Sequence, residues 1–223
     1  MRRRYLIVLL GAYMTWLLCY ELVGHLAARL PTSDLTTSWD RAIPLWPPAV
    51  WAYESCYLLP FVPVILARDW HRINVWLLAC LLANLSAFVV YFALPVAFPR
   101  PALGDGWAER VIAWEYAIDF KPGANNLPSM HVALSWLAVF GCARQGRSAW
   151  LVGALGLLAT LISLSTLFVK QHLVWDVVAG VIWALASWAV AGAWYGRRRQ
   201  KELSPLHNLR RTLGFSHNVG MNA

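Results

Sequence analysis

Two stretches of the chain place a histidine where a polar loop meets a long apolar run. The first covers residues 125–131 and ends in His131, and the second covers residues 170–176 and contains His172. A histidine beside hydrocarbon is unfavourable unless it is partnered or in use, so an ionisable residue at such a border predicts a functional site. Two borders with matching chemistry predict one shared site, provided that the fold brings them together.

The residues around the two histidines have the spacing of a helical site. His172 and Asp176 are four residues apart, which puts them on one helical face, where the carboxylate can hold the imidazole in one tautomer and stabilise its cation. Pro128 suits the first turn of a helix, so we expect a helix to begin near Ser129 and to carry His131 on its first turn. The free N–H groups of such a helix end form an anion site.

Cations complete the set, since Arg100 follows the third apolar run and Lys170 lies two residues before His172. Two histidines, a carboxylate, cations and a helix N-terminus predict phosphoryl transfer without a metal or another cofactor. One histidine would attack phosphorus, the other would protonate the leaving oxygen, and the cations would neutralise the phosphoryl oxygens. Two alternatives are open. A single histidine at a membrane border is more often an interfacial anchor, and the His131, His172 and Asp176 side chains could ligate zinc, although the nearby cations disfavour a metal.

The composition predicts an integral membrane protein. Hydrophobic residues make up 59% of the chain and charged residues 13%, with a mean hydropathy of +0.50, whereas soluble domains carry about 25% charged residues. The net charge of +8 does not indicate nucleic acid binding, because the basic residues cluster at the ends of apolar runs, as membrane topology requires. The four cysteines lack the spacing of a metal site and are interpreted as buried thiols.

Six apolar runs predict an all-α, polytopic membrane protein, a six-transmembrane-helix bundle over residues 1–196 with a basic cytoplasmic tail at 197–223. A span needs about 20 residues, so the short fourth run must extend beyond its apolar part. Most Lys and Arg residues fall on the side of the two termini, which places both termini in the cytoplasm of a cell membrane and the active site on its outward face. The runs cover residues 5–26, 50–67, 74–94, 129–142, 150–168 and 173–195.

The longest loop, residues 95–127, contains an amphipathic stretch at 107–120. Val111, Trp114 and Ile118 recur there at helical spacing, while Glu115 falls among the polar positions. This pattern predicts either a short helix in the outer membrane interface or an irregular polar cap.

Acidic residues near the outer ends of the first two runs are further candidates. Glu21 and His25 are four residues apart near the outer end of the first run, and Glu54 lies near the outer end of the second. Intramembrane acids are rare, so Glu21 and Glu54 could contact a substrate headgroup or an acceptor hydroxyl. The alternative for Glu21 is a structural pair with His25.

These motifs resemble those of the type-2 phosphatidic acid phosphatase superfamily, which carries three blocks: Lys-x6-Arg-Pro, Pro-Ser-Gly-His and Ser-Arg-x5-His-x3-Asp. Arg100 and Pro101 match the end of the first block, and residues 128–131 match the second except that Met130 replaces glycine. The order of the blocks and the six-run topology also agree. The third block is matched, at the right spacing, by Ser165, His172 and Asp176.

The resemblance implies a metal-independent phosphatase or phosphotransferase that acts on a membrane lipid in the bilayer. His172 would be the nucleophile that forms a phosphohistidine, oriented by Asp176, and His131 would be the general acid and then the base. The phosphoryl oxygens would be held by Arg100, Ser129 and Lys170.

Three departures from the blocks qualify what the resemblance implies. Ala93 stands where the first block has lysine, so that phosphate contact is either missing or supplied from elsewhere, for example by Lys121. Thr166 stands where the third block has arginine, and Lys170, one helical turn later, would carry its charge on the same helical face. Met130, with a lysine near the nucleophile, is similar to the branch of inositol phosphorylceramide synthases, which transfer a phospho-headgroup to a lipid alcohol. A phosphotransferase is therefore the alternative to a phosphatase. A non-catalytic membrane transporter or scaffold is the alternative of another class, and the oligomeric state is open.

Overall fold

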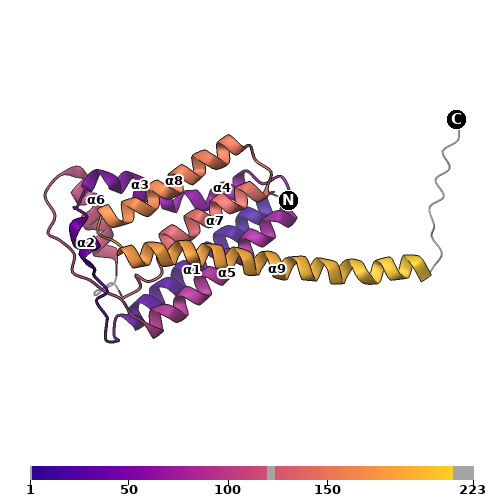
Figure 1. Cartoon of the computed structure of the whole chain (residues 1–223), viewed down its shortest axis with the longest axis horizontal. Helices are drawn as coiled ribbons and strands as arrows, with labels where there is room; N and C mark the ends of the chain where they lie inside the picture. The colour runs from indigo at the N-terminus through magenta and orange to yellow at the C-terminus, as the bar shows by residue number, and fades with distance from the viewer. Residues whose placement is uncertain (1, 120–123, 213–223) are drawn as a thin grey trace.

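The computed structural model describes residues 2–119 and 124–212, and over these residues the regular structure is helical. The long helices run side by side along one axis, with α7 in the middle, and the short helices α2 (Ser38–Ala42) and α6 (Trp107–Ile118) are both at one end of the bundle (Figure 1). The long helices are α1 (Arg2–Ala27), α5 (Trp70–Ala93), α7 (Met130–Arg144), α8 (Ala149–Phe168) and α9 (Val174–Thr212).

Five of the six apolar runs form single α-helices, and the second does not. Residues 50–67 form α3 (Val50–Glu54), two 3₁₀ turns, and α4 (Val62–Ile65). Pro60 and Pro63 lie in this stretch, and proline offers no N–H for the helical hydrogen-bond ladder. This run is therefore a broken helical segment.

Within the described residues, three helices are long and apolar enough to cross a membrane: Arg72–Ala93, Ala149–Phe168 and Val174–Arg197. The α7 helix is apolar but shorter: it ends at Arg144, so the expected extension of the fourth run reaches only two residues beyond residue 142. Six crossings stay a prediction. The last helix continues to Thr212, so no helix end marks the expected boundary between the membrane domain and the tail at residue 196.

The α7 helix is the centre of the packing, in contact with α5, α8 and α9. Its Leu137 is fully buried in a core that also contains Trp76 and Tyr91 of α5. The start of α7 is joined to the start of α9 by a backbone hydrogen bond of 3.0 Å, which the Ser129 N–H donates to the Asp176 carbonyl. This contact brings the two histidine-bearing stretches to one place.

Gly180 allows α9 to approach the start of α7 this closely. A Cβ at position 180 would lie 2.6 Å from the Ser129 carbonyl oxygen and 2.9 Å from Cβ of Val132. We therefore expect Gly180→Ala to destabilise the fold by about 1–3 kcal/mol through overpacking. A displacement of the helices by about 1 Å should also lower turnover about 100-fold. The matched control is Gly192→Ala on the same helix, where a new Cβ meets no atom within 4 Å. Equal thermal stability and turnover for the two variants would contradict this account.

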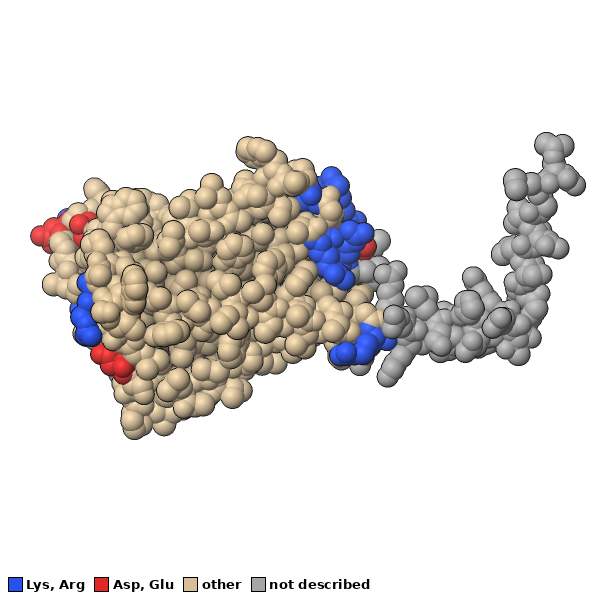
Figure 2. Space-filling view, viewed as in Figure 1, with Lys and Arg blue, Asp and Glu red and all other residues tan. Residues whose placement is uncertain are grey.

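Charged residues divide between the two ends of the bundle. Figure 2 shows Lys and Arg gathered at the end from which α9 leaves, and a mixture of acidic and basic residues at the opposite end. At the basic end, Arg72 donates to the Arg144 carbonyl at 2.8 Å, and Gln145 accepts from the backbone N–H groups of Arg68 and Asp69. The mixed end carries α2 and α6 (Figures 1 and 2).

The stretch in the long loop is a helix, as the first of the two interpretations predicted, but its inward face differs from the expected one. Trp114 and Ile118 are more than half exposed, whereas Ile112 and Glu115 are buried. The assignment of Glu115 to the solvated face of this helix was therefore wrong, because the helix packs against α3 through that side. Phe120, at the end of the stretch, lies outside the described residues.

Candidate active site

Four side chains form one chain of hydrogen bonds at the mixed end of the bundle. Tyr53 Oη lies 2.9 Å from His131 Nε2, and His131 Nδ1 lies 3.0 Å from His172 Nε2. His172 Nδ1 lies 3.3 Å from Asp176 Oδ2. The structure thus brings together the three residues that the sequence predicted to act together, and it adds Tyr53.

The hydrogen-bond partners of Asp176 set the proton positions in this chain. A carboxylate can only accept a hydrogen bond, so the proton of His172 is on Nδ1, which donates to Asp176. In this tautomer His172 Nε2 carries a lone pair. His131 Nδ1 then donates to that lone pair, and the Tyr53 hydroxyl donates to His131 Nε2. The free electron pair of His172 therefore points away from Asp176, toward His131.

The local backbone explains why these side chains meet. His172 and Gln171 donate their N–H groups to the Thr166 carbonyl, which closes the end of α8 and turns the chain into α9. Asp176 accepts from the Leu173 N–H at 2.8 Å and so caps the start of its own helix. Asp176 is fully buried and His172 is 6% exposed. The arrangement is thus held by backbone contacts on both sides of His172.

Asp40 of α2 is a second anchor for the start of α9. Its carboxylate forms a capping box with Thr37 and also accepts from the Val174 N–H at 2.7 Å. Burial works to raise the pKa of Asp40, but the hydrogen bonds from Thr37 and Val174 outweigh it and lower the pKa. An ionised Asp40 therefore ties the segment after α1 to the start of α9, two residues after His172.

Lys170 lies away from the histidines, contrary to its predicted role as a phosphate ligand. Its ammonium group donates to the backbone carbonyls of Asp40, at 2.8 Å, and Ile43. Lys170 has a positive φ of 55°, the left-handed conformation, which turns the side chain toward α2. Burial lowers the pKa of Lys170, and the nearby Asp40 works against this shift. The sequence placed its charge on the helical face of Thr166, but the chain is no longer helical at this residue.

Arg100 contacts Gln171, the residue directly before His172. Its guanidinium forms an ion pair with Asp119, donates to Gln171 Oε1 at 3.0 Å and stacks 4.5 Å above the Tyr116 ring. Gln171 directly precedes His172, so Arg100 is linked to the site through the Gln171 side chain. A phosphoryl group would reach Arg100 only in competition with Asp119.

Ser129 is the N-cap of α7, as the sequence predicted. It is fully buried, and its hydroxyl accepts from the Val132 N–H at 3.5 Å. The structure therefore gives this hydroxyl a helix-capping contact, while His131 stands on the first turn as expected.

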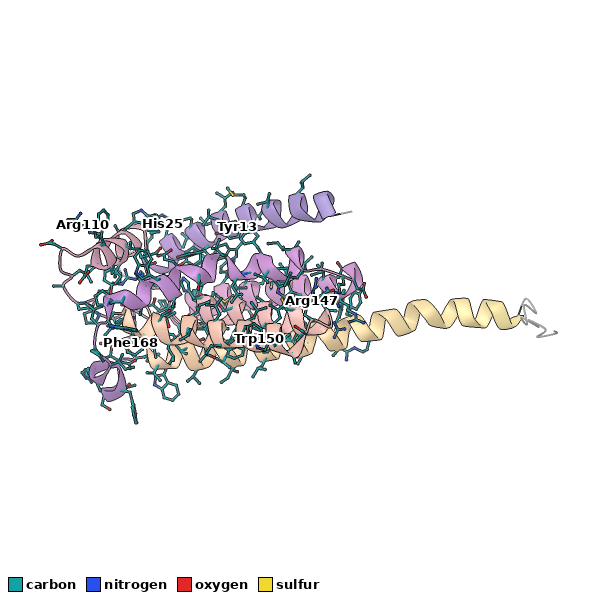
Figure 3. The ribbon with its side chains drawn as sticks, turned by 90° about the horizontal axis from the view of Figure 1, so that it is seen from above. Tyr13, His25, Arg110, Arg147, Trp150 and Phe168 are labelled. Carbon is teal, nitrogen blue, oxygen red and sulfur yellow. The ribbon has the colours of Figure 1, made fainter. Side chains whose placement is uncertain are left out.

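A cavity of about 740 Å³ opens from His131 and His172 along the inside of α1 and α5. Its wall is mainly aromatic and aliphatic. Figure 3 shows α1 along one edge of the bundle, and on it Tyr13, whose ring lies 5.8 Å from that of Phe61. The volume falls within the range of about 300–1,000 Å³ that is usual for ligand pockets.

The cavity accounts for the remaining candidates of the sequence. Glu21 and Glu54 both line it. Glu21 lies 3.8 Å from His25, and both side chains are largely exposed, so the structural pair forms only a loose contact. Lys121 lies outside the described residues.

Two residues of the site carried little or no signal in the sequence. Tyr53 lies inside an apolar run, where an aromatic residue predicts only packing. Asn125 begins the first histidine stretch but had no assigned role; it is 5% exposed, lines the cavity and has an Nδ2 group without a hydrogen-bond partner among the described residues. An amide in a loop directly before a helix N-terminus was the available clue to an anion ligand.

Glu115, which the sequence placed among the polar positions of its helix, lines the cavity instead. Its Oε2 atom accepts from the Tyr57 hydroxyl at 3.1 Å, and its side chain lines the cavity beside Glu54. Burial, and next the charge of Glu54, raise the pKa of Glu115 to about 7. The two carboxyl groups therefore compete for a proton near neutral pH.

A comparison with protein families places these residues in context. A family model described as the PAP2 superfamily matches residues 35–190, a range that includes every member of the hydrogen-bonded chain from Tyr53 to Asp176. No curated protein and no solved structure matches this chain.

Proposed function

Since this chain belongs to the PAP2 superfamily, we propose that it is an integral-membrane enzyme that cleaves a lipid-linked phosphate through a phosphohistidine. The observation that carries the proposal is the chain from Asp176 through His172 to His131, with its 3.0 Å contact between the two imidazoles. It presents a nucleophilic nitrogen and a proton donor side by side, which is the requirement for displacement at phosphorus.

The proposed first step follows from the proton positions. A phosphate ester enters as its monoanion between the two rings, replaces their direct contact and gives its proton to the neutral His131. The lone pair of His172 Nε2 forms a bond to phosphorus as the bond from phosphorus to the lipid oxygen breaks. Protonated His131 gives its proton to that oxygen, and Asp176 stabilises the cationic His172. In the second step neutral His131 takes a proton from water, and the water oxygen displaces His172.

Asn125 is proposed to supply part of the phosphate binding that Ala93 and Thr166 lack. Its unpartnered Nδ2 group is a buried donor in the cavity wall, and removal of a donor to a developing oxyanion lowers turnover by about 10²–10³-fold. We expect Asn125→Ala to lose that factor in kcat and to become less sensitive to vanadate. The control is Asn84→Ala, since Asn84 lines the same cavity but already donates to the Cys80 carbonyl at 2.8 Å. Turnover within threefold of the wild type would exclude this role for Asn125.

The orientation in the membrane is part of the proposal. The basic end of the bundle would face the cytoplasm, with both termini, and the histidines would face outward at the bilayer surface, in line with the positive-inside rule (Figure 2). The cavity along α1 and α5 would then take the lipid's apolar chains, because its wall is mostly apolar.

The test is product release by purified protein in detergent from a panel of lipids: phosphatidic acid, phosphatidylglycerol phosphate, undecaprenyl pyrophosphate and a lipid phosphodiester. Half of the reactions contain an alcohol acceptor, and His172→Ala is the control. Free phosphate that depends on His172 supports the phosphatase. No free phosphate from any lipid, with or without acceptor, would refute it.

One observation favours the second candidate, a phosphotransferase similar to the inositol phosphorylceramide synthase branch. His172 is 6% exposed and faces a mainly apolar cavity, so a phosphohistidine there would be shielded from water. A lipid or sugar alcohol in the cavity could accept the phosphoryl group instead. A new phospholipid formed only with acceptor would identify the transferase.

A further inference from the structure

Glu54 and Glu115 form a carboxyl pair in the cavity wall that the proposed phosphoryl transfer does not use. They come from α3 and α6, two short helices that pack together at the site end of the bundle. Glu115 is 4% exposed, and each of the two side chains has one buried oxygen, Oε1, without a hydrogen-bond partner among the described residues. Both residues line the cavity that contains His131 and His172.

The pair has no cationic partner among the described residues. The Arg100 guanidinium, which lies at this end, is paired with Asp119, and that of Arg110 lies over the Trp107 ring at 5.4 Å. A buried carboxylate without a compensating charge is unfavourable, and here the raised pKa of Glu115, from burial and the charge of Glu54, lets a proton near neutral pH relieve part of that cost. An ammonium group that enters with a ligand would take the place of this proton and compensate both carboxylates.

The surroundings of the pair suit an organic cation. The Tyr57 ring touches both parts of the site: its hydroxyl donates to Glu115 at 3.1 Å, and its centroid lies 6.0 Å from that of His131. Trp114, from the same helix as Glu115, also lines the cavity. Aromatic faces attract an ammonium group, and the carboxylates accept its N–H groups. The Tyr57 ring therefore lies between the Glu54–Glu115 pair and the proposed position of the phosphate at the histidines.

We propose that the Glu54–Glu115 pair binds the ammonium group of a 2-aminoalkyl phosphate whose phosphorus lies at the histidine pair. This proposal rests on the proposed function for the phosphate position and adds the substrate class: a zwitterionic phosphate ester with a primary amine a few bonds from phosphorus. The chemistry is shared by an aminoethyl phospholipid and by free phosphorylethanolamine, and the apolar cavity favours the lipid.

The experiment measures binding in the His172→Ala background, so its outcome does not depend on turnover. Short-chain phosphatidylethanolamine, its N-acetylated form, phosphatidylglycerol and phosphorylethanolamine are titrated against the purified protein in detergent, and binding is followed by tryptophan fluorescence. The variants are Glu115→Gln, Glu54→Gln and, as a matched control on α6 outside the cavity wall, Glu109→Gln. Thermal stability is measured for each. Lys121→Gln tests whether that lysine already neutralises the pair.

We expect the amine lipid to bind at least about 30-fold more tightly than its N-acetylated form, since loss of one partner of a buried charge pair weakens binding by about 2 kcal/mol or more. Glu115→Gln and Glu54→Gln should remove this preference, and Glu109→Gln and Lys121→Gln should keep it. Preference for phosphorylethanolamine over the lipid would assign the site to the free metabolite. Equal binding of amine and N-acetyl lipids, tighter binding of phosphatidylglycerol, or a preference that appears only in Lys121→Gln would overturn the proposal. If the wild-type protein released no phosphate, the proposed phosphatase activity would be refuted, while the amine-binding proposal would still be decided by these binding measurements.

Discussion

His172→Ala is expected to lower turnover by at least about 10⁴-fold while the protein keeps its fold. The imidazole supplies the only electron pair that the hydrogen-bonded chain directs toward the substrate position, and loss of a nucleophile removes the covalent route as a whole. Removal of the imidazole leaves the buried Asp176 without this partner, but Asp176 still accepts from the Leu173 N–H, so we expect a modest loss of thermal stability and no loss of the fold.

The measurement is a pair of assays on purified protein. Steady-state phosphate release gives the loss of turnover, and an alkaline quench of a reaction with ³²P-labelled substrate traps the phosphohistidine. We expect label on the wild type and none on His172→Ala. The control is His207→Ala, in the part of α9 beyond the candidate membrane span, which should keep both signals. Label on His172→Ala, or turnover near that of the wild type, would assign the nucleophile to another residue.

Asp176→Asn is expected to lower turnover by about 10²–10³-fold, because it removes the negative charge that stabilises the cationic His172. The Leu173 N–H and His172 Nδ1 both contact Oδ2 of Asp176, so an amide oxygen at that position keeps both hydrogen bonds and the tautomer of His172. The amide NH₂ group then takes the position of Oδ1, which has no hydrogen-bond partner among the described residues.

A structural role alone would show a different pattern from this loss of charge. Asp176→Asn should form phosphoenzyme at a rate reduced by the same factor as turnover, with a substrate KM within a few fold of the wild-type value and thermal stability lowered only modestly. Asp105→Asn, in the exposed loop before α6, is the matched control and should behave as the wild type. A raised KM with unchanged kcat would show that Asp176 acts in binding instead.

The neighbouring interactions show how far residue spacing alone predicts such a site. The spacing of His172 and Asp176 and the helix start before His131 are local features, and the first pair is in contact at 3.3 Å while Ser129 caps α7. The prediction that His172 and Asp176 share one helical face was wrong, because α9 begins at Val174 and His172 lies in the turn before it. Asp176, in the first turn of α9, reaches back to His172 and to the Leu173 N–H. The helical stretch in the long loop and the three most apolar membrane-length helices follow from periodicity.

Lys170 shows where this local reasoning ends. Its distance from Thr166 is one helical turn, but α8 ends at Phe168, and the positive φ of Lys170 directs its ammonium group to carbonyls some 130 residues earlier in the chain. Whether a helix continues through such a position depends on the tertiary contacts that its side chain can make in each conformation. Here those contacts are with the carbonyls at the end of α2.

The sequence by itself therefore determined the helical class, the two histidine stretches and the pairing of His172 with Asp176, because each depends on residues within one or two turns. Only the tertiary structure decided that Tyr53 joins His131, that Asp40 holds the start of α9, and that Glu115 turns inward beside Glu54. These contacts join residues from separate helices, and their geometry depends on close approaches such as that of α9 to α7 at Gly180, which no local pattern encodes.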